Sequence, residues 1–507
     1  MEKNSPRKIK KIEMPHTYII IFFVVLFASI LTYIVPSGYF QVRETSYEDL
    51  SGNVKTRTVP IPGTFQYETN DSGKPVRNGI ELFAEGGGIG VTNYAFEGLV
   101  SGSKWGSAVG VIAFILIIGG AFGIVMKTGA IEAAIMAVIK KSRKTEILII
   151  PVLFILFSLG GALFGMGEQA MVFIMIIAPL MVALKYDAVT AVMVTYVATQ
   201  IGFGTSPMNP FSCMIAQGIA GVPILSGALF RWIMWSFFTI LGIVYTMIYS
   251  RNIRKNPTHS PSYESDAYFR EDMEAKKNIA VKLELGHILV LLIFGLTMVW
   301  IIWGVITRSY YIPEIATQFF VMGMIAGIIG VIFKLNGMKM NDIARSFMKG
   351  SSNLLAPALV VGFAKGIVLV LGGDNPAVPS VLNTVLHHAG KALSDFPTTL
   401  SAWSMYLFQS VFNFFVVSGS GQAALTMPIM APLAEMIGVT KQVAVLAFQL
   451  GDGFTNLIVP TSGALIGALA AARIDWLKWV KFQLKFQLIL FICASIIIIL
   501  AVMIGFK

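Results

Sequence analysis

Long apolar runs separated by short polar segments dominate this chain. The clearest runs are residues 17–36, 108–126, 146–163, 228–249, 287–306, 316–333 and 484–505. Many windows exceed the roughly 18 consecutive apolar residues that indicate a membrane span. The pattern therefore predicts an all-α polytopic membrane protein.

Two kinds of interruption break this pattern inside apolar sequence. Glycine and polar residues interrupt it at GMGEQ (165–169, tip 1) and SGSGQ (418–422, tip 2). Glycine, proline and polar residues interrupt it again at residues 204–210 (break 1) and 452–462 (break 2). Non-helical backbone at membrane depth is tolerated only where protein or a water-filled cavity satisfies the freed N–H and C=O groups. The four interruptions therefore predict a polar site within the membrane.

The interruptions belong to a duplicated pattern. Each tip is followed at the same spacing by the letters APL, and each break contains Q-x-G-x-G followed by T-[SN]-x-x-x-P. An internal duplication should be sought first because it decides the architecture. We place the two copies at roughly residues 90–250 and 340–505. Repeats with interrupted helices are typical of secondary transporters, whose solute sites lie at the interruptions.

Basic residues predict how the repeats cross the membrane. Lysine and arginine favour cytoplasmic segments, so the basic N-terminal tail is expected in the cytoplasm. Basic residues flank the hairpin of tip 1, which is therefore expected to enter from the cytoplasm, whereas the hairpin of tip 2 should enter from outside. The sequence thus predicts inverted repeats with about nine transmembrane helices plus two re-entrant hairpins. Residues 37–104, rich in polar and β-branched positions, predict a small extracellular β-rich loop.

These expectations divide the chain into six parts. They are an N-terminal tail and first scaffold helix (1–36), the extracellular loop and arm (37–104), a first inverted repeat (105–250) with hairpin 145–185 and broken helix 188–222, a cytoplasmic linker (251–286), scaffold helices (287–340), and a second inverted repeat (341–507) with hairpin 398–437 and broken helix 440–472.

Composition and charge agree with a membrane protein. The chain is 55% hydrophobic and only 13% charged, against about 25% charge in a typical soluble domain. The net charge of +11 is explained by basic loops, so no nucleic-acid partner is expected. The two cysteines, Cys213 and Cys493, both lie in apolar segments and form neither a disulfide framework nor a metal cluster.

Polar side chains at the tips and breaks are the candidate binding groups. Helix N-termini suit a carboxylate, and carbonyl or hydroxyl oxygens at helix breaks suit a cation such as sodium. Small polar residues in membrane helices more often support packing, but their paired placement in two repeats favours function. The predicted substrate-binding residues are Gly167, Glu168, Gln169, Thr205, Ser206, Asn209, Ser418, Ser420, Gln422, Asp452, Thr455, Asn456, Thr461 and Ser462. A sodium site is expected near Gly165, Gly204, Thr205, Asp452 and Thr455.

Two of these residues, Glu168 and Asp452, are acidic. An ionisable residue within the membrane is costly and is a functional hypothesis by default. The carboxyls could be protonated and neutral, could pair with Lys365, could carry protons, or could meet a cationic group of the solute. Asp374, after helix 352–371, is expected only to cap or turn that helix.

At these blocks the chain resembles the ion transporter superfamily. The tips with their APL segments and GFGTSPMNP are similar to the clamp motifs of that superfamily, and EMPHTYIIIFFVVLFASILTYIVPSGYF, GMGEQ and GDGFTN resemble the YfcC family of DcuC-type carriers. The resemblance covers nearly the whole chain. It implies a homodimer with scaffold and transport domains and an elevator-like displacement.

The resemblance leaves the substrate open. Relatives carry C4-dicarboxylates, short-chain acids or amino acids, and YfcC-like proteins are often labelled basic amino-acid antiporters. The tips GMGEQ and SGSGQ depart from the Ser-Asn-Thr tips of sodium/dicarboxylate relatives. The departure weakens the expectation of a dicarboxylate and of a sodium site like theirs.

Together these features predict a secondary active transporter of small charged metabolites in the cell (cytoplasmic) membrane. A basic amino acid, exchanged or ion-coupled, is the favoured substrate because acidic residues at both sites would repel a dianion. A sodium- or proton-coupled C4-dicarboxylate or short-chain carboxylate transporter is the alternative. No cofactor is expected beyond a coupling ion, sodium or a proton.

Two other classes of protein fit the sequence less well. A channel would need a continuous polar path, whereas the polar residues concentrate at two mid-membrane levels. A membrane-embedded hydrolase would need a nucleophile with a base, and neither Ser206 nor Ser418 has a histidine nearby in a motif. The chain contains no P-loop, H-E-x-x-H or G-x-S-x-G motif, so we do not expect an enzyme.

Overall fold

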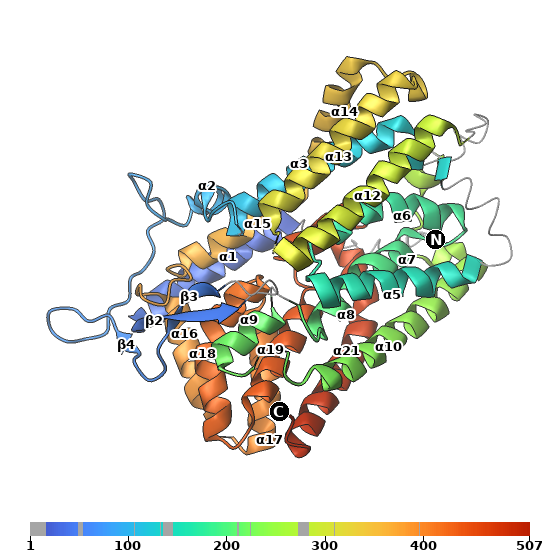
Figure 1. Cartoon of the computed structure of the whole chain (residues 1–507). Coiled ribbons are helices and arrows are strands. Elements are labelled where there is room, and N and C mark those ends of the chain that lie inside the picture. The colour runs from blue at the N-terminus through green and yellow to red at the C-terminus, as the bar shows by residue number, and fades with distance from the viewer. Residues whose placement is uncertain are drawn as a thin grey trace, which may run out of the picture.

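The structure is a computed structural model, and its described residues are mostly helical (Figure 1). It describes the chain except for residues 1–16, 49–53, 106, 132, 135–145, 210–211, 224, 272–282, 309 and 395.

One group of helices, the α3 bundle, packs around α3 (Ser107–Thr128). Helices α13 (Ile312–Ile332) and α14 (Met340–Asn353) contact α3, and α12 (Leu285–Arg308) packs on α13. On the flank of this bundle, α15 (Leu355–Val370) contacts α1 (Thr17–Ile34), α2 (Tyr94–Val100) and α3. It also contacts α20 (Gly463–Ala471), which belongs to the second group.

The second group, the core bundle, contains both tips and both breaks. Its first half consists of α5 (Glu146–Phe164), α6 (Ala170–Ala183), α7 (Ala188–Val192), the π-helix η1 (Met193–Val197), α8 (Ala198–Gly204), α9 (Cys213–Ala220) and α10 (Ala228–Lys255). Its second half consists of α17 (Thr398–Phe412), α18 (Gly419–Met436), α19 (Lys441–Thr455), α20 (Gly463–Ala471) and α21 (Trp476–Met503), preceded by α16 (Val381–Ser394). Short 3₁₀ turns, η2 (Pro257–His259) and η3 (Leu335–Gly337), follow α10 and α13 and contact them.

Several helices are long and apolar enough to cross a bilayer. In the described part of the chain they are α3, α10, α12, α13 and α21, and the bent pair α14–α15 counts as one more if it is a single span. The two segments of that pair meet at an angle of 42°. Helices α1, α5, α6 and the α7–α8 segment are also apolar but shorter. Length and composition alone give this set, so the nine crossings stay a prediction.

The helices stop at the tips and breaks, but not always at the expected residue. Tip 1 separates α5 from α6, and Gly165 takes a positive φ of 61° where α5 ends, a conformation that favours glycine. Residues 419–422 of tip 2 are already helical because Ser418 caps α18 by accepting a hydrogen bond from the Gly421 N–H. In break 2, likewise, α19 continues to Thr455 and only residues 456–462 are non-helical.

The two broken helices cross where a glycine from each makes contact. A Cβ added to Gly453 would lie 2.4 Å from the Gly204 Cα, closer than real side chains approach. Gly202 and Gly161 allow an equally close crossing of α8 with α5. Small residues at such crossings let helix backbones pack tightly within a membrane. Glycine therefore brings break 1 and break 2 next to each other.

Residues 37–104 contain two antiparallel strand pairs. Strands β1 (Gly38–Tyr39) and β4 (Gln66–Tyr67) pair, and β2 (Val42–Glu48) pairs with β3 (Val54–Pro60). The β2–β3 hairpin lies against α9 and α18 of the core bundle (Figure 1). The side of the membrane on which these strands lie stays a prediction.

A buried acidic pair joins the linker after α10 to the core bundle. The carboxylate of Asp187, which caps α7, accepts hydrogen bonds from the hydroxyls of Tyr249 and Ser260. Asp266, from the linker, accepts from the Ser262 hydroxyl at 2.9 Å, and both carboxylates are 1% exposed. Burial, and then the neighbouring Asp187 charge, raise the pKa of Asp266 to about 7.

We expect this pair to make folding stability pH-dependent. The pKa of Asp266 in the unfolded chain is about 3.9. Because the folded pKa is higher, the stabilisation from protonated Asp266 is complete below about pH 4 and is lost as pH rises to about 7. The thermal unfolding midpoint of purified protein should fall between pH 5 and pH 8 by more in wild type than in Asp266→Asn. A substitution of the exposed Asp71 by asparagine is the control, and equal falls in all three proteins would contradict the prediction.

Candidate solute-binding site

A cavity of about 1280 Å³ lies between the core bundle and the α3 bundle. The core bundle contributes tip 1, the start of α18 and the end of break 2. The opposite wall comes from Trp105, Ala108, Val111 and Ile312. The cavity thus has the starts of interrupted helices on one side and both apolar and charged residues on the other.

Helix starts form the polar wall. Ser418 and Ser462 are the N-caps of α18 and α20, and both line the cavity. Gly419 and Gly463, the first residues of those helices, line it as well. The first N–H groups of a helix lack intrahelical partners and carry its positive dipole end. The wall can therefore receive a carboxylate.

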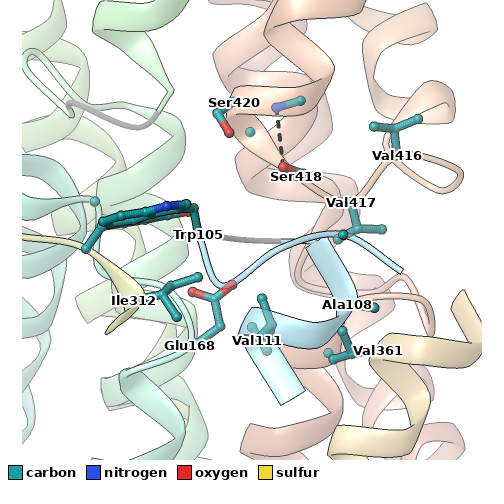
Figure 2. Close-up of a pocket in the computed structure, with 18 of the residues that line it drawn as sticks. Trp105, Ala108, Val111, Glu168, Ile312, Val361, Val416, Val417, Ser418 and Ser420 are labelled. Carbon is teal, nitrogen blue, oxygen red and sulfur yellow. Dashed lines mark hydrogen bonds between the residues drawn. The ribbon is translucent and has the colours of Figure 1, made fainter. Parts of the chain in front are cut away.

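Glu168 is the acidic residue that tip 1 contributes to the cavity wall. Figure 2 shows its side chain with Trp105, Val111 and Ile312, and shows Ser418 and Ser420 on the ribbon of α18. The side chain is partly buried. Its neighbours Gly167 and Gln169 also line the cavity, and the Gln169 side chain accepts a hydrogen bond from the Gly167 N–H at 2.9 Å. An acid in this position offers a cationic group of a solute a direct partner.

Asp452 lies behind the wall. It is fully buried, and its Oδ1 accepts a hydrogen bond from Asn456 at 3.1 Å. Among the described residues, no donor reaches its Oδ2. A Cβ placed on Gly419 would come within 2.8 Å of that oxygen, so the carboxylate sits beside the start of α18.

The structure divides the predicted site residues into two sets. Those that line the cavity are Gly167, Glu168, Gln169, Ser418, Ser420, Asn456, Thr461 and Ser462. Those that lie outside its lining are Thr205, Ser206, Asn209, Gln422, Asp452 and Thr455. Of the expected sodium ligands, Gly165 lines the cavity, whereas Gly204, Thr205, Asp452 and Thr455 do not.

Side chains of the second set hold the interrupted backbone. The Thr205 hydroxyl donates to the Ile201 carbonyl, and the Ser206 hydroxyl donates to the Ala162 carbonyl of α5, both at 2.6 Å. The Ser206 hydroxyl also accepts from the N–H groups of Met208 and Asn209. These hydroxyls satisfy freed backbone groups, and neither Thr205 nor Ser206 lines the cavity in this arrangement.

Each half of the core bundle also holds the break of the other half. Tyr196, from η1, donates its hydroxyl to the Asn456 carbonyl in break 2 at 2.9 Å. Gln449, from α19, donates its amide to the Ser206 carbonyl in break 1 at 2.9 Å. The two breaks are therefore parts of one hydrogen-bonded unit.

Lys365 does not pair with either of the two acids of the predicted site. Its amino group lies 2.6 Å from the Asp374 carboxylate, and both residues line the cavity. The expectation that Asp374 only caps or turns its helix was therefore incomplete. Asp374 follows Lys365 by nine positions, and the turn after α15 places its carboxylate within hydrogen-bond distance of the lysine. Arg308 and Glu314 line the same cavity from the end of α12 and the start of α13.

Other residues of the site were absent from the sequence-based set. Trp105 lines the cavity, as do Gln200 and Phe203 of α8. Asn413, from the hairpin of tip 2, donates to the side-chain oxygen of Asn456 at 2.8 Å. Gln200 begins the duplicated Q-x-G-x-G pattern, which was a usable signal. Trp105 comes from another bundle, so no local pattern could place it.

Comparison with known proteins identifies the family. The model of the DcuC family, described as "C4-dicarboxylate anaerobic carrier", matches residues 14–503. The chain belongs to the DcuC family. This confirms the resemblance to DcuC-type carriers. With its many apolar helices, this DcuC member is a multi-pass membrane transporter.

Two curated relatives match almost end to end. An Escherichia coli (strain K12) protein named "Putative basic amino acid antiporter YfcC" is 51% identical over 497 residues, covering 97% of each chain. A Haemophilus influenzae protein named "Uncharacterized protein" is 27% identical over 534 residues, covering 98% of this DcuC member and 99% of that protein.

Among solved structures, the Alcanivorax borkumensis YdaH transporter is similar over 97% of this chain and 99% of that transporter's chain, at 13% identity and a TM-score of 0.42. So weak a structural likeness carries no argument about this chain.

Proposed function

We propose that this DcuC member is a secondary active transporter for a basic amino acid, working by exchange or by ion coupling. The observation that carries the proposal is the cavity in which Glu168 shares the wall with the starts of α18 and α20. Helix N-termini receive the solute carboxylate, and Glu168 receives a cationic group. Asp452 adds negative charge behind the wall without touching the solute. The name of the 51% identical relative supports the same substrate class.

The proposed cycle is an elevator-like displacement of the core bundle along the α3 bundle. Both tips and both breaks belong to one hydrogen-bonded unit, which can move without losing the site. We place the protein in the cell membrane as a homodimer with a cytoplasmic N-terminus. The coupling ion is sodium or a proton. Sodium would use oxygens near Gly165, Gly204, Thr205, Asp452 and Thr455, and a proton would use the two acids.

A C4-dicarboxylate is the second candidate. Lys365 and Arg308 line the cavity, and the helix starts favour anions. The description of the DcuC family supports this reading. It requires neutralisation of Glu168 and Asp452 by a proton or sodium, because their charges would otherwise repel a dianion.

Exchange in proteoliposomes tests the proposal. Vesicles loaded with arginine are offered labelled arginine, ornithine, glutamate or succinate, with sodium and pH varied independently. We expect saturable uptake of arginine and ornithine that depends on internal arginine or on an ion gradient. Empty vesicles and vesicles with boiled protein are the controls. Saturable uptake of succinate alone would replace the first candidate by the second.

A further inference from the structure

Arg231 carries a charge in the core bundle that the site described above does not include. It lies in the first turn of α10 and is fully buried. Its side chain donates to the side-chain oxygens of Gln449 at 2.7 Å and Gln442 at 2.9 Å, and to the Ser226 carbonyl at 3.0 Å. Its guanidinium also lies 5.2 Å from the centre of the Phe506 ring. Among the described residues, no carboxylate forms an ion pair with it.

An arginine in this position determines how the Gln449 amide is oriented. A guanidinium has only donors, so the oxygen of the Gln449 amide must face it. The amide nitrogen must then point away, and it donates to the Ser206 carbonyl of break 1. Without this constraint the amide could turn over and present an oxygen to that carbonyl. The charged donor also makes the bond to Gln449 stronger than one between neutral groups.

The connection continues from Ser206 to the hairpin of tip 1. The Ser206 hydroxyl donates to the Ala162 carbonyl near the end of α5, immediately before tip 1. Arg231 is therefore connected to the end of α5 through Gln449, Ser206 and Ala162, a path that joins α10, α19, break 1 and α5. Tip 1, which contains Glu168 of the cavity wall, follows the end of α5 directly.

We infer that Arg231 is a positioning residue for the solute site, acting through Gln449 on break 1. It touches neither the cavity nor the solute. It holds the Gln449 amide in the one orientation that satisfies the Ser206 carbonyl. It thereby keeps break 1 in place against the end of α5, where tip 1 begins. The inference rests on the proposed placement of the solute site at the tips and breaks.

A matched pair of variants separates this role from simple charge balance. Gln449→Glu and Gln442→Glu each place a carboxylate on Arg231 at the position of an amide oxygen. Both lose an amide donor, but the donor of Gln442 goes to Ser226, whereas that of Gln449 goes to break 1. Arg231→Met would remove three hydrogen bonds at once and is expected to impair folding, so it is not the decisive variant.

We expect Gln449→Glu to slow exchange by about tenfold or more, because an unsatisfied carbonyl would face a carboxylate. Gln442→Glu should remain within about twofold of wild type. Hydrogen–deuterium exchange of the purified protein should increase in residues 205–209 in Gln449→Glu only. That readout needs no substrate, so it decides the inference even if arginine is not transported. Equal exchange rates and equal deuterium uptake in the two variants would overturn it.

Discussion

Asp452→Asn is expected to reduce arginine exchange by about tenfold or more while leaving the protein folded. Asparagine has the shape of aspartate and can still accept the hydrogen bond from Asn456. The substitution removes only the buried negative charge. A unit charge behind the wall, about 8 Å from a cationic group, is worth roughly 2 kcal/mol at an effective dielectric constant of about 20, which is more than tenfold in rate or affinity. Initial rates in proteoliposomes, normalised to the amount of folded protein, measure the effect.

The same substitution distinguishes the two candidate substrates. If the solute is a dicarboxylate, removal of a repulsive charge should maintain or increase succinate uptake. Glu435→Gln, at an acid paired with Lys441 and outside the large cavity, is the matched control and should retain wild-type exchange. Wild-type arginine exchange in Asp452→Asn would remove this residue from the account.

Gly453→Ala is expected to abolish transport and to lower stability. The added methyl would lie 2.4 Å from the Cα and 2.7 Å from the N of Gly204, and backbone cannot rotate away as a side chain can. Overpacking of this kind costs about 1–3 kcal/mol or more. The two broken helices must move apart, which also separates break 1 from break 2. We expect loss of exchange together with a lower thermal unfolding midpoint.

Two other glycines, Gly204 and Gly295, allow the three alanine variants to be ranked by how close the added methyl would lie to other atoms. A Cβ on Gly204 would lie 3.2 Å from the Gly453 Cα, so Gly204→Ala should have a smaller effect. Gly295 in α12 has no atom within 4 Å of an added Cβ, so Gly295→Ala should be neutral or slightly stabilising. A Gly453→Ala protein as active and stable as Gly295→Ala would show that the crossing is not close-packed.

The interruptions of the helices could be located from the sequence because they change local chemistry. Glycine and polar residues in an apolar run, as at tip 1 and break 1, mark places where helical hydrogen bonding stops. The exact helix starts were harder to predict. At tip 2 the first helical residue depends on Ser418 acting as the N-cap of α18. The sequence alone does not show which of the neighbouring polar residues takes this role.

The direction in which each polar side chain points could not be predicted in the same way. From the sequence, Thr205 and Ser206 are candidate solute ligands. In the structure, their hydroxyls donate hydrogen bonds to backbone carbonyls. Lys365 was a plausible partner for a site acid until the turn after α15 brought Asp374 to it. Arg231 gave an available signal, since a charge inside an apolar run is a functional hypothesis by default. Trp105 depends on the packing of separate bundles.

The central claim is that both halves of the core bundle form one solute site. Equilibrium binding of labelled arginine to purified protein tests it most directly, with Glu168→Gln from the first half, Ser462→Ala from the second and the double variant. We predict one site per chain, at least about tenfold weaker binding in each single variant, and a combined loss that differs from the sum of the two because the residues share a ligand. Full affinity in either single variant, or two independent sites per chain, would contradict the account.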